Sequence, residues 1–543
     1  MTEKELTELV KAIGKAMGFE DKTNGFFRTN RNAVNGARYF GFISKADGNV
    51  QDDTSVIDNE NDESGAYSGL SLVFFPYVSD VSKKGEKKDG NGDVESFVVS
   101  LGVGTLGLVS DYELAARPGT RRLFLRLRDE NNKNNQFFKN DFTDISKDFV
   151  NDLEKDFTIA EKYGKLLQAG QFVKIDYNNQ GQKDETDTNI SVDNNESKIN
   201  EGKFEEQEIE SQIKKSNPSE RPAPVFNIIC RWIATYAAMR KHVWKSYKQG
   251  SLNFKEAITS SLPKPINKEL KTDDVYQILL NNHFIVLQGA PGTGKTWSAN
   301  EVANKFSKGI VFFEQFHAET TYSDFIYGIR PKLHSNTLKY EDKKGVLLDA
   351  IEKAEGNEEK KVLLIIDEIN RANLSNVLGP VFYLFEKGAS NRTHKMKVGN
   401  RELEKLPDNL YVIATMNTAD RSLAVVDFAL RRRFTWLTLK PHEIAVTGKT
   451  FMRDYFNDMA AIFEEYATDE ELNLQPGQSY FIVDESTNKG DDKNNEEEGF
   501  MKERLKYELM PLIKEYLNEG YLASAKEVFC NYFYQTIGEL MYE

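Results

Sequence analysis

The sequence predicts an α/β fold: a parallel sheet with a helical segment after it and an α+β domain before it. Three observations predict the sheet. Short apolar runs cover residues 284–288, 361–366 and 409–415, and each leads into glycine, carboxylate or amide residues. Helical patterns separate these runs, as expected for buried parallel strands whose carboxyl ends meet at one edge.

Length and composition narrow the possibilities further. A chain of 543 residues is too long for one hydrophobic core, so two or three domains are expected. No apolar run approaches the ~20 residues of a membrane span, and residues 1–19 resemble an amphipathic helix more than a signal peptide. We therefore expect a cytoplasmic protein with no membrane partner. Its net charge of −14 argues against uniform coating of nucleic acid but allows a local basic face.

The two cysteines, Cys230 and Cys530, lie far apart in the chain and lack metal-ligand spacing. They cannot form a disulfide framework or a zinc site by themselves. Small buried apolar positions are the expected environment for both.

Residues 1–177 are expected to form an α+β recognition domain. An opening helix precedes β-rich apolar runs at 37–44, 69–78 and 96–104. Residues 178–224 have few aromatic residues and an excess of Asn, Asp, Glu and Ser, which predicts a flexible acidic linker.

Residues 122–128 alternate between arginine or phenylalanine and leucine, which predicts a strand with one apolar face. The other face would suit the phosphates and a stacked base of double-stranded DNA, possibly carrying a modified base. An ordinary solvated sheet face is the alternative. The candidate DNA contacts are Arg122, Phe124, Arg126 and Arg128.

A connector helix is expected within residues 225–264. Phe226, Ile229, Ile233 and Ala237 recur at helical spacing, so we expect residues 225–249 to form a helix that docks on the domain after it. Packing is the expected role of Trp232.

The most specific motif is Gly-Ala-Pro-Gly-Thr-Gly-Lys-Thr at residues 289–296, which follows an apolar run and precedes a helical pattern. Its glycines allow backbone N–H groups to surround phosphates at a helix N-terminus. Lys295 would reach the β- and γ-phosphates, and the Thr296 hydroxyl would bind Mg²⁺. The expected nucleotide contacts are Gly289, Pro291, Gly292, Thr293, Gly294, Lys295, Thr296 and Trp297.

Polar residues at the ends of the next two runs complete the predicted site. Asp367 is placed to hold the magnesium, and Glu368 to act as general base on the attacking water. Asn417 would contact the γ-phosphate or that water. Three arginines at 431–433 end a helical pattern; they suit either a solvated basic corner or an arginine finger supplied to a neighbouring subunit.

Residues 265–485 closely resemble the McrB family of AAA+ GTPases. The resemblance is carried by Met-Asn-Thr-Ala-Asp-Arg-Ser at 416–422 and Asp-Glu-Ile-Asn-Arg-Ala-Asn at 367–373. Phe316-His317, Asp324-Phe325 and residues 422–433 are also similar, as is Gln-Ser-Tyr-Phe at 478–481.

This resemblance implies an AAA+ core over residues 265–440 and a helical lid over 441–543. It further implies a hexameric ring that binds GTP (or ATP) with Mg²⁺ between subunits, and a McrC-like nuclease subunit as partner. Arg432 would be the finger, with Arg433 and Arg371 as supporting contacts, and Asp420 would order the signature loop. The loop reads Gly-Ala-Pro-Gly-Thr-Gly at 289–294, where some relatives have other small residues at the variable positions. This departure leaves the expected fold unchanged and says nothing about the base.

Two other functions remain compatible with the sequence. One is an ATP-driven remodeller of proteins, similar to the MoxR relatives. The other is a nucleotide-gated sensor or scaffold whose first domain binds a protein or phage component. No residue identified here selects guanine or adenine. The sequence contains no Pro-Asp-x-Glu-x-Lys nuclease signature, which favours a separate cutting subunit.

Overall fold

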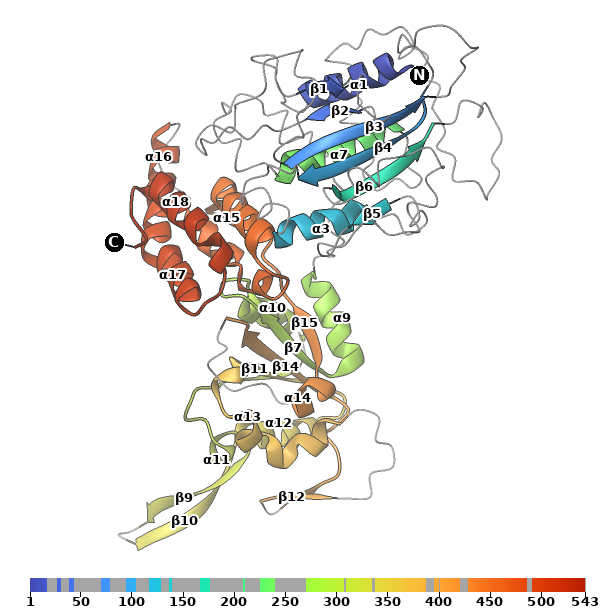
Figure 1. Cartoon of the computed structure of the whole chain (residues 1–543). Helices are drawn as coiled ribbons and strands as arrows, with labels where there is room; N and C mark the ends of the chain where they lie inside the picture. The colour runs from blue at the N-terminus through green and yellow to red at the C-terminus, as the bar shows by residue number, and fades with distance from the viewer. Residues whose placement is uncertain are drawn as a thin grey trace, which may run out of the picture. The chain divides into compact units, whose positions relative to one another are not determined.

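The structure is a computed structural model that describes residues 1–16, 27–30, 39–42, 70–78, 94–103, 117–127, 136–138, 167–175, 209, 225–239, 270–306, 309–334, 337–386, 395–399, 401–419, 428–485 and 491–542. The chain divides into two compact units, Met1–Ile266 and Asn267–Glu543 (Figure 1). Apart from residue 209, the expected linker at 178–224 lies outside the described residues.

The first unit contains an antiparallel sheet of six strands, in the order β1-β2-β3-β4-β6-β5. The three apolar runs expected as strands form its β2, β3 and β4. The strand bounds are β1 (Phe27–Asn30), β2 (Tyr39–Phe42), β3 (Leu70–Val78), β4 (Val94–Val103), β5 (Gln136–Phe138) and β6 (Leu167–Lys174).

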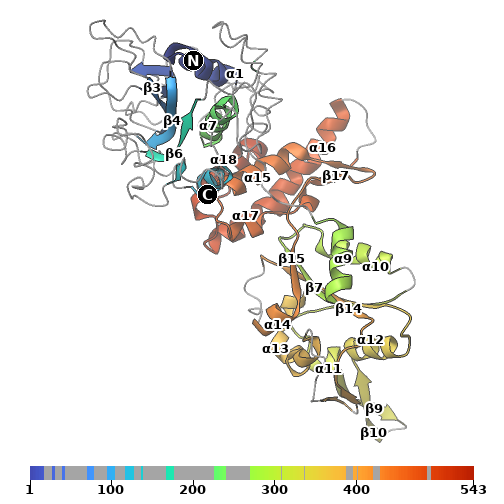
Figure 2. The same cartoon turned by 90° about the vertical axis from the view of Figure 1, so that its right-hand side faces the viewer.

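Helices α1 (Glu3–Ala16) and α7 (Val225–Met239) share one hydrophobic core with this sheet (Figure 2). Trp232 of α7 is fully buried, and its Nε1 donates a hydrogen bond to Gln171 Oε1 at 3.0 Å. Burial raises the pKa of the Cys230 thiol on the same helix. The helix was expected, but its docking direction was wrong: α7 packs on the sheet that precedes it in the chain.

The predicted strand at 122–128 is instead the helix α3 (Pro118–Leu127). Its sequence fits both patterns, because Leu123, Phe124 and Leu127 also lie on one face of a helix. Pro118 at the first helical position was the signal that distinguished the two.

The DNA-contact prediction therefore needs correction. Phe124 is only 6% exposed and belongs to the hydrophobic core, so it cannot stack on a base. The strand prediction placed Phe124 on one face with Arg122, Arg126 and Arg128. Residues of a helix do not alternate between two faces in this way. The Arg126 side chain and Arg128 lie outside the described residues.

The second unit is built on a parallel sheet of five strands in the order β15-β7-β14-β11-β8. The three predicted apolar runs form β7, β11 and β14, as expected. β11 is buried along its whole length, because helices cover both faces of the sheet. The strand bounds are β7 (Phe284–Gly289), β8 (Ile310–Gln315), β11 (Val362–Asp367), β14 (Leu410–Asn417) and β15 (Thr435–Thr438).

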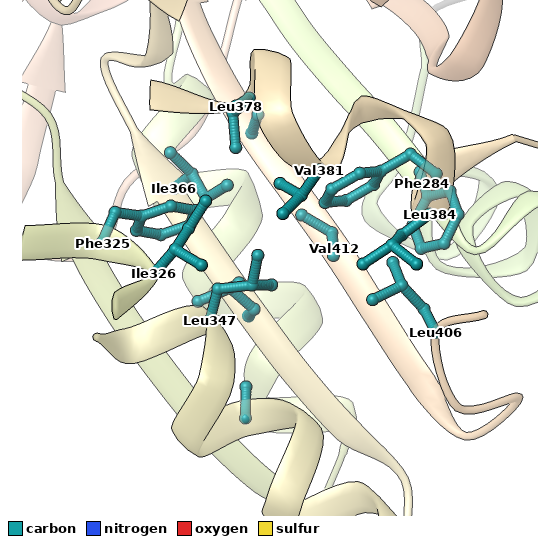
Figure 3. Close-up of a cluster of buried hydrophobic side chains, with 14 of the residues drawn as sticks. Phe284, Phe325, Ile326, Leu347, Ile366, Leu378, Val381, Leu384, Leu406 and Val412 are labelled. Atoms are coloured by element: carbon teal, nitrogen blue, oxygen red, sulfur yellow. The ribbon is translucent and has the colours of Figure 1, made fainter. Parts of the chain in front are cut away.

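Each face of this sheet has its own core. Helices α9 (Thr272–Asn282) and α10 (Lys295–Lys305) cover one face. Figure 3 shows the core on the other face, where Phe284, Ile366 and Val412 of the sheet meet apolar side chains of the covering helices. That layer comprises α11 (Tyr322–Phe325), α12 (Val346–Glu355), η4 (Ile369–Arg371), α13 (Leu374–Val377), η5 (Gly379–Phe385) and α14 (Phe428–Arg433).

Two hairpins extend this layer: β9 (Tyr327–His334) with β10 (Thr337–Lys344), and β12 (Met396–Val398) with β13 (Arg401–Leu403). Figure 2 shows the β9–β10 hairpin projecting beyond α11 and α12. Leu333 pairs with Leu338, and Pro331 with Tyr340, so these side chains share one face of the hairpin.

The C-terminal segment is helical, as expected for a lid, with its own core. Its elements are β16 (Lys449–Phe451), α15 (Arg453–Tyr466), η6 (Glu471–Leu474), η7 (Gln478–Phe481), β17 (Ile482–Asp484), α16 (Asp491–Arg504), the π-helical turn η8 (Leu505–Leu509), α17 (Met510–Asn518), η9 (Ala523–Ala525) and α18 (Lys526–Ile537). No helix in the described part of the chain is long and apolar enough to cross a membrane.

Candidate nucleotide site

The predicted phosphate-binding loop joins β7 to α10 at the carboxyl edge of the parallel sheet. Gly292 and Gly294 have φ angles of 78° and 81°, in the left-handed region that glycine adopts without strain. Gly294 directly precedes α10, so the loop leads into a helix N-terminus whose dipole favours an anion. This is the backbone geometry expected of a phosphate site.

Lys295 lies folded against its own loop. Its Nζ donates hydrogen bonds to the carbonyl oxygens of Gly289 at 3.1 Å and Ala290 at 2.8 Å, and the residue is 8% exposed. These two carbonyl oxygens take the place of water around the Lys295 ammonium group.

Asp367 connects the loop to the neighbouring strands. Its Oδ1 accepts hydrogen bonds from the hydroxyls of Thr296 at 2.8 Å and Thr415 at 2.7 Å, and the residue is 6% exposed. Thr296 and Asp367 thus present two adjacent oxygens, the ligand type that Mg²⁺ prefers. The residues fit a magnesium site that is completed by phosphate and water. Among the described residues, no group of three or more His, Cys, Asp or Glu side chains could hold a metal ion by itself.

Thr415 is a site residue that the sequence analysis did not identify. It is buried within β14, and its Oγ1 both donates to Asp367 and accepts from the backbone N–H of Glu368 at 3.0 Å. One hydroxyl therefore positions both members of the acidic pair. A threonine at the end of an apolar run gave little signal, because its importance depends on which strand lies beside it.

Glu368 has a backbone conformation that is unusual for its type, with φ 54° and ψ 48°. Such left-handed residues are strained and concentrate at functional sites. Its Oε2 is buried and accepts no hydrogen bond from the described residues, while Arg371 Nε lies 3.5 Å away. Oε2 of Glu368 is thus a buried oxygen that is ion-paired with the Arg371 guanidinium.

Asn417 ends β14, the strand next to β7, as predicted for a residue that faces the nucleotide. Its Oδ1 accepts from the Ala419 N–H at 3.2 Å, and its carbonyl accepts from Asn370 Nδ2 at 3.3 Å. The next residue, Thr418, donates its N–H to the Gly289 carbonyl at 3.0 Å, which ties this segment to the phosphate loop. Asp420 lies outside the described residues.

The arginines at the end of α14 differ in exposure. Arg432 has a side chain 66% exposed and lies 3.8 Å from Glu386 Oε1. Arg433 is 8% exposed, 3.8 Å from Glu386 Oε2, and its guanidinium lies 5.7 Å from the Phe382 ring centre. The Arg432 side chain is therefore exposed, whereas Arg433 is buried within its own unit. The finger role of Arg432 stays a prediction.

Trp297 has its side chain exposed: the residue is 63% exposed on α10. Its predicted contact with the nucleotide stays a prediction. On the other side of the loop, burial raises the pKa of the Tyr480 phenol, and the Glu508 carboxylate raises it further. Tyr480 therefore remains a neutral packing group above Gly292 at physiological pH.

Comparisons with known proteins cover the part of the chain that contains this site. Residues 284–434 match the AAA domain family of the dynein-related subfamily. The chain is 43% identical over 165 residues to the "Type IV methyl-directed restriction enzyme EcoKMcrB subunit" of Escherichia coli. It is 29% identical over 201 residues to the "Type II restriction enzyme BsuMI component YdiS" of Bacillus subtilis. The expected resemblance to McrB and the AAA fold are thereby confirmed for the second unit.

These matches are partial. They cover 29% and 30% of this chain, and the chain spans only 35% and 59% of the length of the two relatives. Among solved structures, the branch migration motor RuvB of Thermotoga maritima aligns at 15% identity with a TM-score of 0.19, covering 36% of this chain and 48% of that chain. NtrX of Brucella abortus aligns at 14% identity with a TM-score of 0.22, covering 45% and 50%. Nothing further follows from scores this low.

Proposed function

We propose that this chain hydrolyses a nucleoside triphosphate, GTP rather than ATP, and that hydrolysis drives a restriction system with a separate nuclease subunit. The observation that carries the hydrolase proposal is the hydrogen-bonded set of Thr296, Asp367 and Thr415 beside the phosphate loop. The match of this unit to an AAA domain supports it.

Binding would begin at the phosphate loop. The backbone N–H groups and the α10 dipole would receive the β-phosphate, and Lys295 would exchange its two carbonyl partners for β- and γ-phosphate oxygens. Bound Mg²⁺ would neutralise phosphate charge next to Thr296 and Asp367.

Hydrolysis would then depend on Glu368. A water oxygen attacks the γ-phosphorus, the bond to the β–γ bridging oxygen breaks, and the water proton passes to the Glu368 carboxylate. Glu368 Oε2 makes no hydrogen bond to the described residues but is ion-paired with Arg371 Nε at 3.5 Å, so it would accept the water proton beside this guanidinium. Asn417 would orient the water or the γ-phosphate from the adjacent strand, and Arg432 of a neighbouring copy would stabilise the developing charge.

The restriction role rests on the relatives. Both are restriction-enzyme components, and one is described as methyl-directed. We infer a homo-oligomeric ring, a McrC-like nuclease as partner, and double-stranded DNA with a modified base as the target of the first unit. The matched segment lies in the second unit, so the first unit is where this chain's own specificity would reside.

Comparing GTP and ATP turnover by the full chain tests the proposal, with Lys295→Ala as the inactive control. Preferred turnover of GTP, lost in Lys295→Ala, is the expected result. A clear preference for ATP would favour the remodeller similar to MoxR relatives. Undetectable turnover of both nucleotides despite tight binding would favour the nucleotide-gated sensor.

A further inference from the structure

The lid closes directly on the back of the phosphate loop through three consecutive residues. The Gly477 N–H donates to the Pro291 carbonyl at 2.8 Å, and the Ser479 N–H donates to the Gly292 carbonyl at 3.1 Å. Between them, Gln478 Nε2 donates to the Thr293 carbonyl at 3.0 Å. Three successive loop carbonyls are therefore held from the lid side.

The lid backbone approaches the loop backbone very closely at Gly477. A Cβ on Gly477 would lie 2.0 Å from the Gly292 carbonyl carbon, so no other residue fits there without moving the loop. Residues 477–479, which form this clamp on the loop, are also held by the rest of the lid. Arg504 Nη1 donates to the carbonyls of Ser479 at 2.8 Å and Ile482 at 2.7 Å, and Phe481 is fully buried in the lid core. A movement of the lid helices must therefore reach the loop.

Peptide geometry gives this clamp a direct effect on phosphate binding. In a trans peptide the carbonyl of one residue and the N–H of the next point in opposite directions. Holding the carbonyls of Pro291, Gly292 and Thr293 toward the lid turns the N–H groups of Gly292, Thr293 and Gly294 away from it. The Thr293 N–H donates to the Ala290 carbonyl at 3.4 Å, so the N–H groups of Gly292 and Gly294 are the ones that would receive a phosphate.

Of these three hydrogen bonds, only the one from Gln478 is made by a side chain. It is 6% exposed, and its Oε1 is buried without a hydrogen-bond partner among the described residues. Rotating the amide by half a turn would place Oε1 against the Thr293 carbonyl oxygen, so the donor must face the loop. An unsatisfied buried acceptor offsets the stability gained from the Nε2 bond. Stability alone is thus a poor reason for glutamine here.

We propose that Gln478 is a positioning residue that presents the phosphate loop to the nucleotide and couples lid position to nucleotide occupancy. The inference rests on the proposed nucleotidase function and deepens it. Because Gln478 acts on the loop and not on Glu368, its loss should weaken nucleotide binding more than it slows the bound reaction.

The test compares three full-length variants with the wild type. Gln478→Ala removes the donor, and Gln478→Glu replaces it with an acceptor facing a carbonyl. Gln475→Ala is the matched control, a half-buried glutamine three residues earlier in the same loop. The measurements are the Kd of a fluorescent GTP analogue, KM and kcat, and the unfolding temperature without nucleotide.

Gln478→Ala should raise Kd and KM by about threefold to tenfold, the size expected for one hydrogen bond, with a smaller change in kcat. Gln478→Glu should raise them further and should also unfold at a lower temperature, because its buried carboxylate would face the Thr293 carbonyl oxygen. The unfolding temperature of Gln478→Ala should stay close to that of Gln475→Ala. Wild-type Kd and KM in both Gln478 variants would overturn the proposal. So would an unfolding temperature of Gln478→Ala lowered in step with its affinity, because that indicates a merely structural contact. If the wild type itself binds no nucleotide, the proposed function fails first, and Lys295→Ala would then match the wild type.

Discussion

Thr415 shows how one buried hydroxyl can organise a reaction centre. It holds the carboxylate of Asp367 and the backbone of Glu368 at once, across two adjacent parallel strands. We expect Thr415→Val to lower kcat on the order of tenfold, since both acidic residues lose their orientation. The Glu368 N–H would also lose its partner, which costs about 1–3 kcal/mol of stability. Steady-state kinetics and urea unfolding measure the two effects.

Thr415→Ser is the matched control, because it keeps the hydroxyl and removes only a methyl group. It should retain most of the turnover. Equal activity in the valine and serine variants would show that the hydroxyl has no positioning role.

Glu368 offers a second prediction at the same scale. Glu368→Gln keeps the size of the side chain but removes the base, so nucleotide binding should persist while kcat falls by about 10²–10⁴-fold. The exposed Glu319→Gln is the control and should behave like the wild type. Single-turnover hydrolysis with tightly bound nucleotide measures the chemical step, and a normal rate there would remove Glu368 from the role of base.

At the scale of elements, burial separates the residues that hold the nucleotide unit together from those that do not. Leu364 in β11 is fully buried, whereas Leu338 on the β10 hairpin is 55% exposed. Leu364→Ala should destabilise the second unit by about 2–5 kcal/mol. Leu338→Ala should change its stability by less than about 0.5 kcal/mol. Loss of nucleotide-analogue fluorescence in urea reports on this unit, and similar midpoints for the two variants would contradict the assignment of the core.

Two elements also show where a local sequence pattern led to a wrong prediction. The leucine–arginine alternation at 122–128 satisfied a strand and a helix equally, and α3 formed because Pro118 favours a helix start and Phe124 finds a core to fill. The helix α7 was predicted from its spacing. Its described side chains are buried, but the spacing could not show which neighbouring domain provides the surrounding core.

For the whole molecule, the exposed Arg432 allows a test of the expected ring. If it acts on the nucleotide of a neighbouring copy, Arg432→Ala and Lys295→Ala proteins, each inactive alone, should regain turnover when mixed. Some interfaces in mixed rings would combine an intact Lys295 with an intact Arg432. The activity of mixtures at several ratios is the measurement. Arg431→Ala is the control, because that guanidinium lies 5.3 Å from the Trp436 ring centre of its own chain. No recovery in rings shown to be mixed would place Arg432 in a role within its own subunit.

The sequence by itself determined the apolar strands of the parallel sheet, the phosphate loop, the acidic pair and the relationship to McrB, because each depends on contiguous residues. Few other folds place a glycine-rich loop between an apolar strand and a helix. Contacts between distant segments were decided only by the tertiary structure. Thr415 reaches Asp367 because β14 lies beside β11, and Gln478 reaches Thr293 because the lid folds back across 185 residues. The burial of Phe124 and Arg433 is of the same kind, since burial depends on which elements pack around a side chain.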